Sequence, residues 1–141
     1  MTDDAETIAT EAELLAEPDE AYMRPAQLAF FRKRLLAQRQ QLLTSGEGSL
    51  HELREAPEVR DDADRASVSD QLDVTLRLRD RERKLLPKID AALRRIDAST
   101  YGWCEETGER IGLRRLLARP TTTLSVEGQL AKEAAEKHYA G

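Results

Sequence analysis

Two pairs of residues near the C-terminal end have the spacing of a four-cysteine zinc site but not its chemistry. Cys104 and Thr107 form the first pair, and after seventeen further residues Ser125 and Gly128 form the second. A zinc ribbon has two C-x2-C pairs separated by roughly 15–20 residues. Only Cys104 can supply a thiolate, because hydroxyls stay protonated near neutral pH and glycine has no side chain. We therefore expect a degenerate zinc ribbon without metal, in which packing replaces the ion.

A second candidate for chemistry is an acidic cluster in the middle of the chain. Asp61, Asp62 and Asp64 lie beside Arg65 and Ala66. Acids at this point are ordinary helix caps, favoured by the helix dipole. Three carboxylates in four residues nevertheless exceed what capping requires. Such a cluster also suits contact with a basic or magnesium-containing site in a large partner, so both interpretations stay open.

The composition excludes several classes of protein. The net charge of −5 over 141 residues argues against a protein that grips duplex DNA through a basic face. The two histidines, His51 and His138, are isolated, and no nucleophile is paired with a base, so we do not expect an enzyme. No apolar run is long enough for a membrane span, and residues 1–20 carry eight acids and no base. We expect a cytoplasmic monomer.

Two long amphipathic helices must position these residues. The first is expected to start near Pro25, since proline is tolerated at a helix start, and the second to run from about Ser67 to Asp97. A polar connector, residues 57–66, separates them. Their apolar stripes are Leu28, Phe31, Leu35 and Leu42 in the first helix, and Leu72, Leu76, Leu86, Ile89, Leu93 and Ile96 in the second. Near-heptad spacing with a short link predicts an antiparallel hairpin.

The predicted fold is mainly α, with a long antiparallel coiled-coil hairpin projecting from a small globular base. Residues 1–32 form an N-terminal segment that packs on the base, and residues 33–98 form the hairpin with its tip near 57–66. The degenerate zinc ribbon and a C-terminal helix occupy residues 99–141. Pro87 predicts a kink or a restart in the second arm. Thr122, Thr123 or Ser125 can cap the last helix.

Several independent motifs, in order, resemble the DksA/TraR family, from about residue 20 to the C-terminus. They are Tyr22-Met23, Ala26-Gln27-Leu28, Asp61-x-x-Asp64-Arg65-Ala66, Leu78-Arg79-Asp80-Arg81-Glu82-Arg83-Lys84-Leu85, Tyr101-Gly102-x-Cys104 and Ile111-Gly112-x-Arg114-Arg115-Leu116-x-Ala118-Arg119-Pro120-Thr121. The resemblance implies a bacterial regulator that binds RNA polymerase through its secondary channel, at the β′ subunit, without sequence-specific DNA binding. With the alarmone ppGpp, such proteins modulate promoter open complexes, repress ribosomal RNA promoters and activate some biosynthetic promoters.

Residue roles follow from the same resemblance. Asp61, Asp64 and Ala66 match the tip that approaches the polymerase catalytic centre. The ppGpp pocket shared with polymerase corresponds to Leu85, Lys88, Arg119 and Gln129. Gln129 stands where the family commonly has a base, which weakens anion binding. With three zinc cysteines replaced, the chain resembles a cysteine-poor member with no tightly bound cofactor.

Two other functions share parts of this pattern. A Gre-like transcript-cleavage factor also combines a coiled coil with an acidic tip and uses polymerase magnesium for hydrolysis. The ribbon remnant and the basic run before it favour the DksA/TraR interpretation instead. A ribbon-type nucleic-acid-binding protein is the third class, and net acidity with only 4% aromatic residues argues against it.

Overall fold

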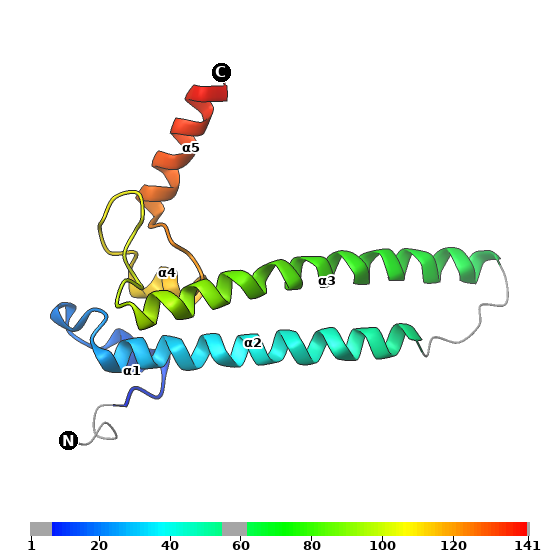
Figure 1. Cartoon of the computed structure of the whole chain (residues 1–141), viewed down its shortest axis with the longest axis horizontal. Helices are drawn as coiled ribbons and strands as arrows, with labels where there is room; N and C mark the ends of the chain where they lie inside the picture. Colours follow the sequence, from blue (N-terminus) through cyan, green and yellow to red (C-terminus); the bar gives the residue numbers. More distant parts are fainter. Residues whose placement is uncertain (1–6, 55–61, 141) are drawn as a thin grey trace. The chain divides into compact units, whose positions relative to one another are not determined.

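The described part of the chain is mainly helical (Figure 1). The computed structural model describes the backbone of residues 7–54 and 62–140, and the side chains of residues 7–45 and 69–138. The elements in chain order are α1 (Glu11–Leu15), the 3-10 helix η2 (Asp19–Ala21), α2 (Pro25–Arg54), α3 (Asp62–Asp97), α4 (Leu113–Ala118) and α5 (Val126–Ala140). Among these residues there is no strand, and one isolated β-bridge joins Trp103 to Arg110. The predicted mainly α fold is confirmed.

The two long helices are α2, of 30 residues, and α3, of 36 residues. Helix α2 begins at Pro25, as predicted, and the hairpin of two long helices is confirmed. Helix α3 begins at Asp62 rather than near Ser67, so Asp64 and Ala66 belong to the helix and not to a connector. Acidic residues in a first turn favour this earlier start through the helix dipole. None of the described helices combines the length and the apolarity needed to cross a membrane.

Helix α3 continues through Pro87 without interruption, so of the two predicted alternatives the restart is wrong and the kink stays a prediction. A proline inside a helix costs about 3 kcal/mol, because one backbone hydrogen bond is lost and the ring crowds the preceding turn. The ring of Pro87 is exposed, whereas Ile89 and Ala92 just beyond it are fully buried. Burial of these two side chains offsets the cost and keeps the helix in register.

The chain divides into two compact units. One consists of Met1–Leu35 and Ile89–Gly141, and the other of Leu36–Lys88. The first unit contains the largest buried apolar side chains, which are Leu14, Phe31, Leu35, Ile89, Tyr101 and Leu116. They come from α1, α2, α3, the turn after α3, and α4, so segments distant in sequence share one core.

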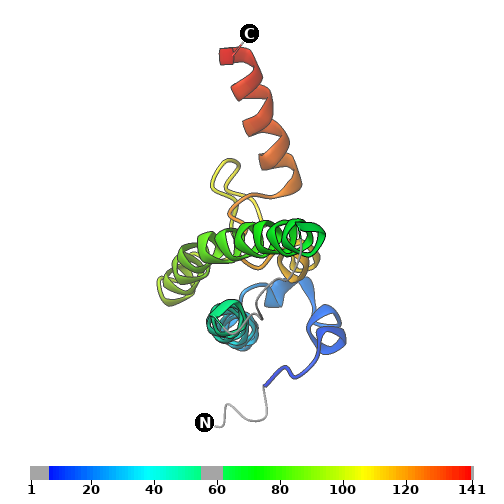
Figure 2. The same cartoon turned by 90° about the vertical axis from the view of Figure 1, so that its right-hand side faces the viewer.

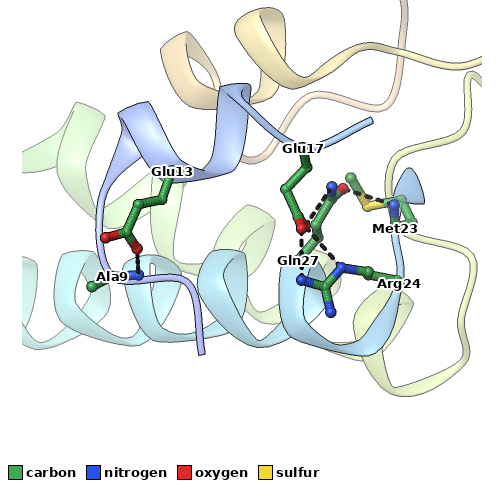
Figure 3. Close-up of polar contacts among 6 residues, drawn as sticks. All are labelled: Ala9, Glu13, Glu17, Met23, Arg24 and Gln27. Carbon is green, nitrogen blue, oxygen red and sulfur yellow. Dashed lines mark hydrogen bonds and ion pairs between the residues drawn. The ribbon is translucent and has the colours of Figure 1, made fainter. Parts of the chain in front are cut away.

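The short helix α1, which the sequence analysis did not predict, is fixed by two capping hydrogen bonds, of which Figure 3 shows the one from Ala9 to Glu13. The hydroxyl of Thr10 accepts a hydrogen bond from the Glu13 amide at 3.1 Å. In return, the Glu13 carboxylate accepts one from the Ala9 amide at 2.8 Å. This arrangement satisfies one amide of the first helical turn and the amide of Ala9, the residue before the cap. It places Leu14 in the core, where that side chain is fully buried.

A second polar network joins the N-terminal segment to the start of α2 (Figure 3). The Glu17 carboxylate accepts two hydrogen bonds from the Arg24 guanidinium, at 2.8 and 2.7 Å, and one from Gln27 Nε2 at 3.2 Å. The bonds from Arg24 lower the pKa of Glu17 and outweigh the opposing effect of burial. Gln27 is fully buried, and its Oε1 accepts from the Met23 amide at 2.9 Å. The network therefore fixes Met23 in its left-handed conformation, at φ 59°.

Helix α5 is capped by Ser125, one of the three predicted candidates. Its hydroxyl accepts a hydrogen bond from the Gly128 amide at 3.0 Å, and its carbonyl accepts one from the Gln129 amide at 2.9 Å. From Leu130 to His138 every residue of α5 is exposed, and Figure 2 shows no other element of the same unit beside most of its length. The helix is therefore tied to its unit mainly through its first turn.

Candidate functional site

The four ribbon positions converge on the sulfur of Cys104. This side chain is buried, and it makes hydrogen bonds with the hydroxyls and the backbone amides of Thr107 and Ser125. Gly128 closes the remaining side, because a Cβ built on it would overlap Cys104 Sγ and stand 3.2 Å from Ser125 Oγ. The sulfur therefore joins the turn at Thr107 to the first turn of α5.

A zinc ion does not fit this set of donors. Structural zinc requires four ligands in a tetrahedron, drawn from thiolates, imidazoles and carboxylates. Here one thiol faces two hydroxyls and a glycine whose backbone fills the place of a fourth ligand. In the described parts of the chain, no three His, Cys, Asp or Glu side chains gather into a possible metal site. The residues at the four ribbon positions are therefore of the wrong chemical types to bind a structural zinc ion.

Hydrogen bonds, rather than a metal ion, stabilise the charged form of the Cys104 sulfur. Burial raises the pKa of the Cys104 thiol, but the hydrogen bonds from Ser125 and Thr107 together outweigh it and lower the pKa from 9.0 to about 6. Donors that point at a sulfur favour its charged form. The ribbon remnant is therefore organised around a sulfur that accepts several hydrogen bonds, where a zinc ribbon is organised around a cation.

Tyr22 anchors the same region to the N-terminal segment. Its hydroxyl donates to the Gly102 carbonyl at 2.6 Å and accepts from the Gly112 amide at 2.9 Å. Burial raises the pKa of Tyr22, so the phenol remains protonated and can donate. Gly102 has φ 93°, and a Cβ there would stand 2.8 Å from Met23 Sδ, so a side chain at this position would be strained and crowded.

An aromatic and cationic layer covers Tyr22, and sequence reasoning missed it. The Trp103 ring meets Tyr22 edge to face at a centroid distance of 5.4 Å. The Arg110 guanidinium lies 4.8 Å from the centre of the Tyr22 ring and donates to the Asp19 carbonyl at 3.0 Å. These residues come from segments that are distant in sequence, and no local spacing links them. The only available signal was a lone tryptophan in a glycine-rich turn.

The predicted tip residues are only partly within the described structure. Asp61 lies outside the described residues. Asp64 and Ala66 fall in the first turns of α3, in a part of the helix whose side chains are not described. Their assignment to the tip stays a prediction.

The four residues assigned to the ppGpp pocket belong to different units. Leu85, which is half-buried, and the exposed Lys88 lie in the unit Leu36–Lys88. Arg119 is exposed at the C-terminal end of α4, and Gln129 lies in α5 with its Nε2 donating to Glu133 Oε1 at 2.9 Å. A carboxylate beside Gln129 makes this position still less suited to a phosphate than the loss of a base alone. The pocket assignment stays a prediction.

Family models and known relatives match most of this chain in sequence. Residues 27–96 match the model of the DnaK suppressor protein DksA, N-terminal domain, and residues 99–134 match the prokaryotic dksA/traR C4-type zinc finger. The RNA polymerase-binding transcription factor DksA of Caulobacter vibrioides is 48% identical over 120 residues, which cover 84% of each chain. The chain belongs to the DksA/TraR family. The Escherichia coli DksA is 42% identical over 126 residues, covering 89% of this chain and 83% of the relative.

A solved structure supports the same DksA/TraR fold. The transcription factor DksA2 from Pseudomonas aeruginosa is 54% identical, covers 92% of this chain and 100% of its own, and superposes with a TM-score of 0.77. The family's zinc-finger model spans the ribbon remnant although three of its four cysteine positions are replaced. The DksA/TraR fold is therefore retained here with a buried Cys104 sulfur and only one of the four ribbon positions able to supply a thiolate.

Proposed function

We propose that this chain is a cytoplasmic, non-enzymatic transcription regulator that binds RNA polymerase through the secondary channel, at the β′ subunit. With ppGpp it modulates promoter open complexes, repressing ribosomal RNA promoters and activating some others. The observation that carries the proposal is the similarity, along more than four fifths of each chain, to relatives named RNA polymerase-binding transcription factors. In this proposal no tightly bound cofactor takes part, because one thiol, two hydroxyls and a glycine at the ribbon positions do not make a zinc site.

In this proposal the acidic start of α3 acts on polymerase. Asp61, Asp62 and Asp64 lie at or just before the beginning of a 36-residue helix, which at about 1.5 Å per residue is roughly 54 Å long. Carboxylates at the end of such a rod suit a deep basic cavity that contains magnesium. Ala66, one helical turn beyond, supplies a small side chain that lets the rod approach closely.

The test measures polymerase binding and promoter regulation separately, so that an effect of the acidic tip is distinguished from a loss of docking. Asp64→Asn keeps the size of the residue while removing its charge. Because Asp64 lies in the first turn of α3, the loss is limited to its interaction with the helix dipole, about 0.3–1 kcal/mol, and stability should change little. We expect binding to core polymerase within about twofold of the parent protein, and a strong loss of regulation at a ribosomal promoter. Full promoter inhibition by saturating Asp64→Asn would leave the acids as helix caps only. Hydrolysis of RNA in stalled complexes would instead favour a Gre-like cleavage factor.

The ppGpp proposal rests on the cations Lys88 and Arg119, because an anionic nucleotide needs fixed positive charges. Both side chains are exposed. Lys88→Ala and Arg119→Ala should each remove the additional effect of ppGpp while polymerase binding persists. The assay needs polymerase whose own ppGpp site is disabled, so that the response comes from the shared pocket alone.

Gln129 offers a gain-of-function test. Gln129→Lys restores a cation, but Glu133 stands one turn away and already accepts a hydrogen bond from Gln129. The lysine would then pair with that carboxylate, so Gln129→Lys should strengthen the ppGpp response most when combined with Glu133→Gln. Glu133→Gln alone is the matched control. Titration curves that overlap for all of these proteins would mean that the chain has no working ppGpp pocket.

A further inference from the structure

Trp103 is an exposed aromatic residue in a chain that has few aromatic residues. It is the single tryptophan among two phenylalanines and three tyrosines. Phe31 and Tyr101 are fully packed in the core, whereas 41% of the Trp103 surface remains exposed. Large exposed aromatic side chains are enriched at the centres of protein interfaces, where their burial supplies much of the binding energy.

The indole of Trp103 is held rigidly, although it is exposed. Its backbone is paired with Arg110 in the β-bridge, and its ring meets Tyr22 at an interplanar angle of 84°. Tyr22 is in turn fixed at its hydroxyl by Gly102 and Gly112. A side chain held in this way loses little conformational freedom when a partner covers it, so the ring is prepared for binding.

A hollow of about 440 Å³ lies beside the indole within the same unit. Its lining includes Trp103, Thr107, Glu109, Arg110 and Glu127. The Arg110 guanidinium is engaged over the Tyr22 ring and at the Asp19 carbonyl. Glu109 and Glu127 are exposed and form no ion pair with any other described residue. The hollow therefore combines a partly exposed indole with two exposed carboxylates and one guanidinium, so its lining carries a net negative charge.

The charge around the hollow identifies the chemistry of its occupant. Glu105 and Glu106, also exposed, extend the acidic surface along the same turn. Phosphate groups would be repelled by these carboxylates, which argues against a nucleotide or a nucleic acid. An arginine or lysine side chain would be attracted by the carboxylates and by the face of the indole, which is the strongest cation–π acceptor among the aromatic residues.

We propose that Trp103, Glu109 and Glu127 form a docking surface for a basic side chain of a protein partner. The inference rests on the proposed function, which makes RNA polymerase that partner. It adds a contact on the unit that contains the ribbon remnant to those expected from the hairpin tip. This contact strengthens docking, whereas the tip acts on the open complex.

The experiment measures affinity for core RNA polymerase with four variants. Trp103→Ala should weaken binding by about tenfold or more, as expected for an interfacial tryptophan. Glu127→Gln should weaken it several-fold, and the whole effect should shrink at high salt. Glu136→Gln, an exposed carboxylate farther along α5, is the matched control and should stay within about twofold. Trp103→Phe retains an aromatic ring against Tyr22 and should fall between the parent protein and Trp103→Ala.

A direct readout uses the single tryptophan. Protein that carries 5-fluorotryptophan has one fluorine signal, which should shift or broaden when core polymerase is added. If polymerase binds the parent protein and all four variants equally, the docking surface is wrong and the proposed function stands. If polymerase does not bind the parent protein, both ideas fail. A fluorine shift with ppGpp or single-stranded DNA alone would also overturn the inference, because the indole would then stack on a base.

Discussion

Gly128→Ala tests whether the Cys104 sulfur packs directly against Gly128. The substitution should change the free energy of unfolding in two opposite ways. Gly128 lies in the first turn of α5 without a positive φ, so alanine alone should stabilise the helix by up to about 1 kcal/mol. The added Cβ would however overlap Cys104 Sγ and crowd Ser125 Oγ at 3.2 Å. Overpacking of a buried site costs roughly 1–3 kcal/mol, and each disturbed hydrogen bond about 1 kcal/mol more. We therefore expect a net destabilisation of about 1–2 kcal/mol.

The same substitution should change sign when the sulfur is absent. In Cys104→Ala the overlapping atom is gone, so adding Gly128→Ala should be neutral or slightly stabilising. The difference between the two backgrounds is a coupling energy of roughly 1–3 kcal/mol, as observed for residues in direct contact. Urea unfolding of the four proteins, followed by helicity and by Trp103 emission, measures it. If Gly128→Ala stabilises both backgrounds equally, the sulfur does not rest against this glycine and the closed-site account is wrong.

Further predictions concern the metal, the protonation of the sulfur and the tyrosine anchor. Purified protein should contain well under one equivalent of zinc and keep its helicity in chelator; stoichiometric zinc with unfolding in chelator would contradict this. The pKa of Cys104 is about 6 in the folded protein and 9.0 ordinarily, so unfolding between these values takes up a proton. The free energy of unfolding should therefore rise with pH between about 6 and about 9, with a slope of at most roughly 1.4 kcal/mol per pH unit. The contribution of the Cys104 thiolate should be lost as the pH falls through 6. Cys104→Ser should flatten that dependence, and an unchanged slope would place its origin elsewhere. Tyr22→Phe removes the partner of Gly102 and Gly112 and should cost about 1–3 kcal/mol, together with a change in Trp103 emission; unaltered stability would show that solvent replaces both bonds.

The two long helices and the ribbon could be predicted from sequence, because both depend on regular residue spacing. Near-heptad leucines and Pro25 indicated the two long helices, and the spacing between Cys104 and Gly128 indicated a ribbon. Helix α4 escaped detection because six residues contain too few turns to establish a period. The start of α1 did have a signal, since Thr10 and Glu13 have the spacing of a capping box.

Tertiary contacts decided the features that sequence reasoning missed. Pro87 indicated a restart, yet burial of Ile89 and Ala92 carries α3 through it. The Met23 partner of the buried Gln27 lies only four residues away, but the amide nitrogen of Gln27 is satisfied by Glu17, ten residues away, which no local spacing indicates. The layer of Trp103, Tyr22 and Arg110 joins segments up to 91 residues apart, as in the bond from Arg110 to Asp19. Such contacts follow from the completed fold and not from any window of sequence.

The central claim is that this chain regulates initiation through polymerase without a zinc ion. It is tested most directly by transcription with purified components from a ribosomal promoter, with and without ppGpp, using metal-free protein and the Asp64→Asn variant. The account predicts that the metal-free parent protein represses transcription, that ppGpp deepens the repression, and that Asp64→Asn represses weakly. Repression that appears only after zinc is added, or no repression at any protein concentration, would contradict it.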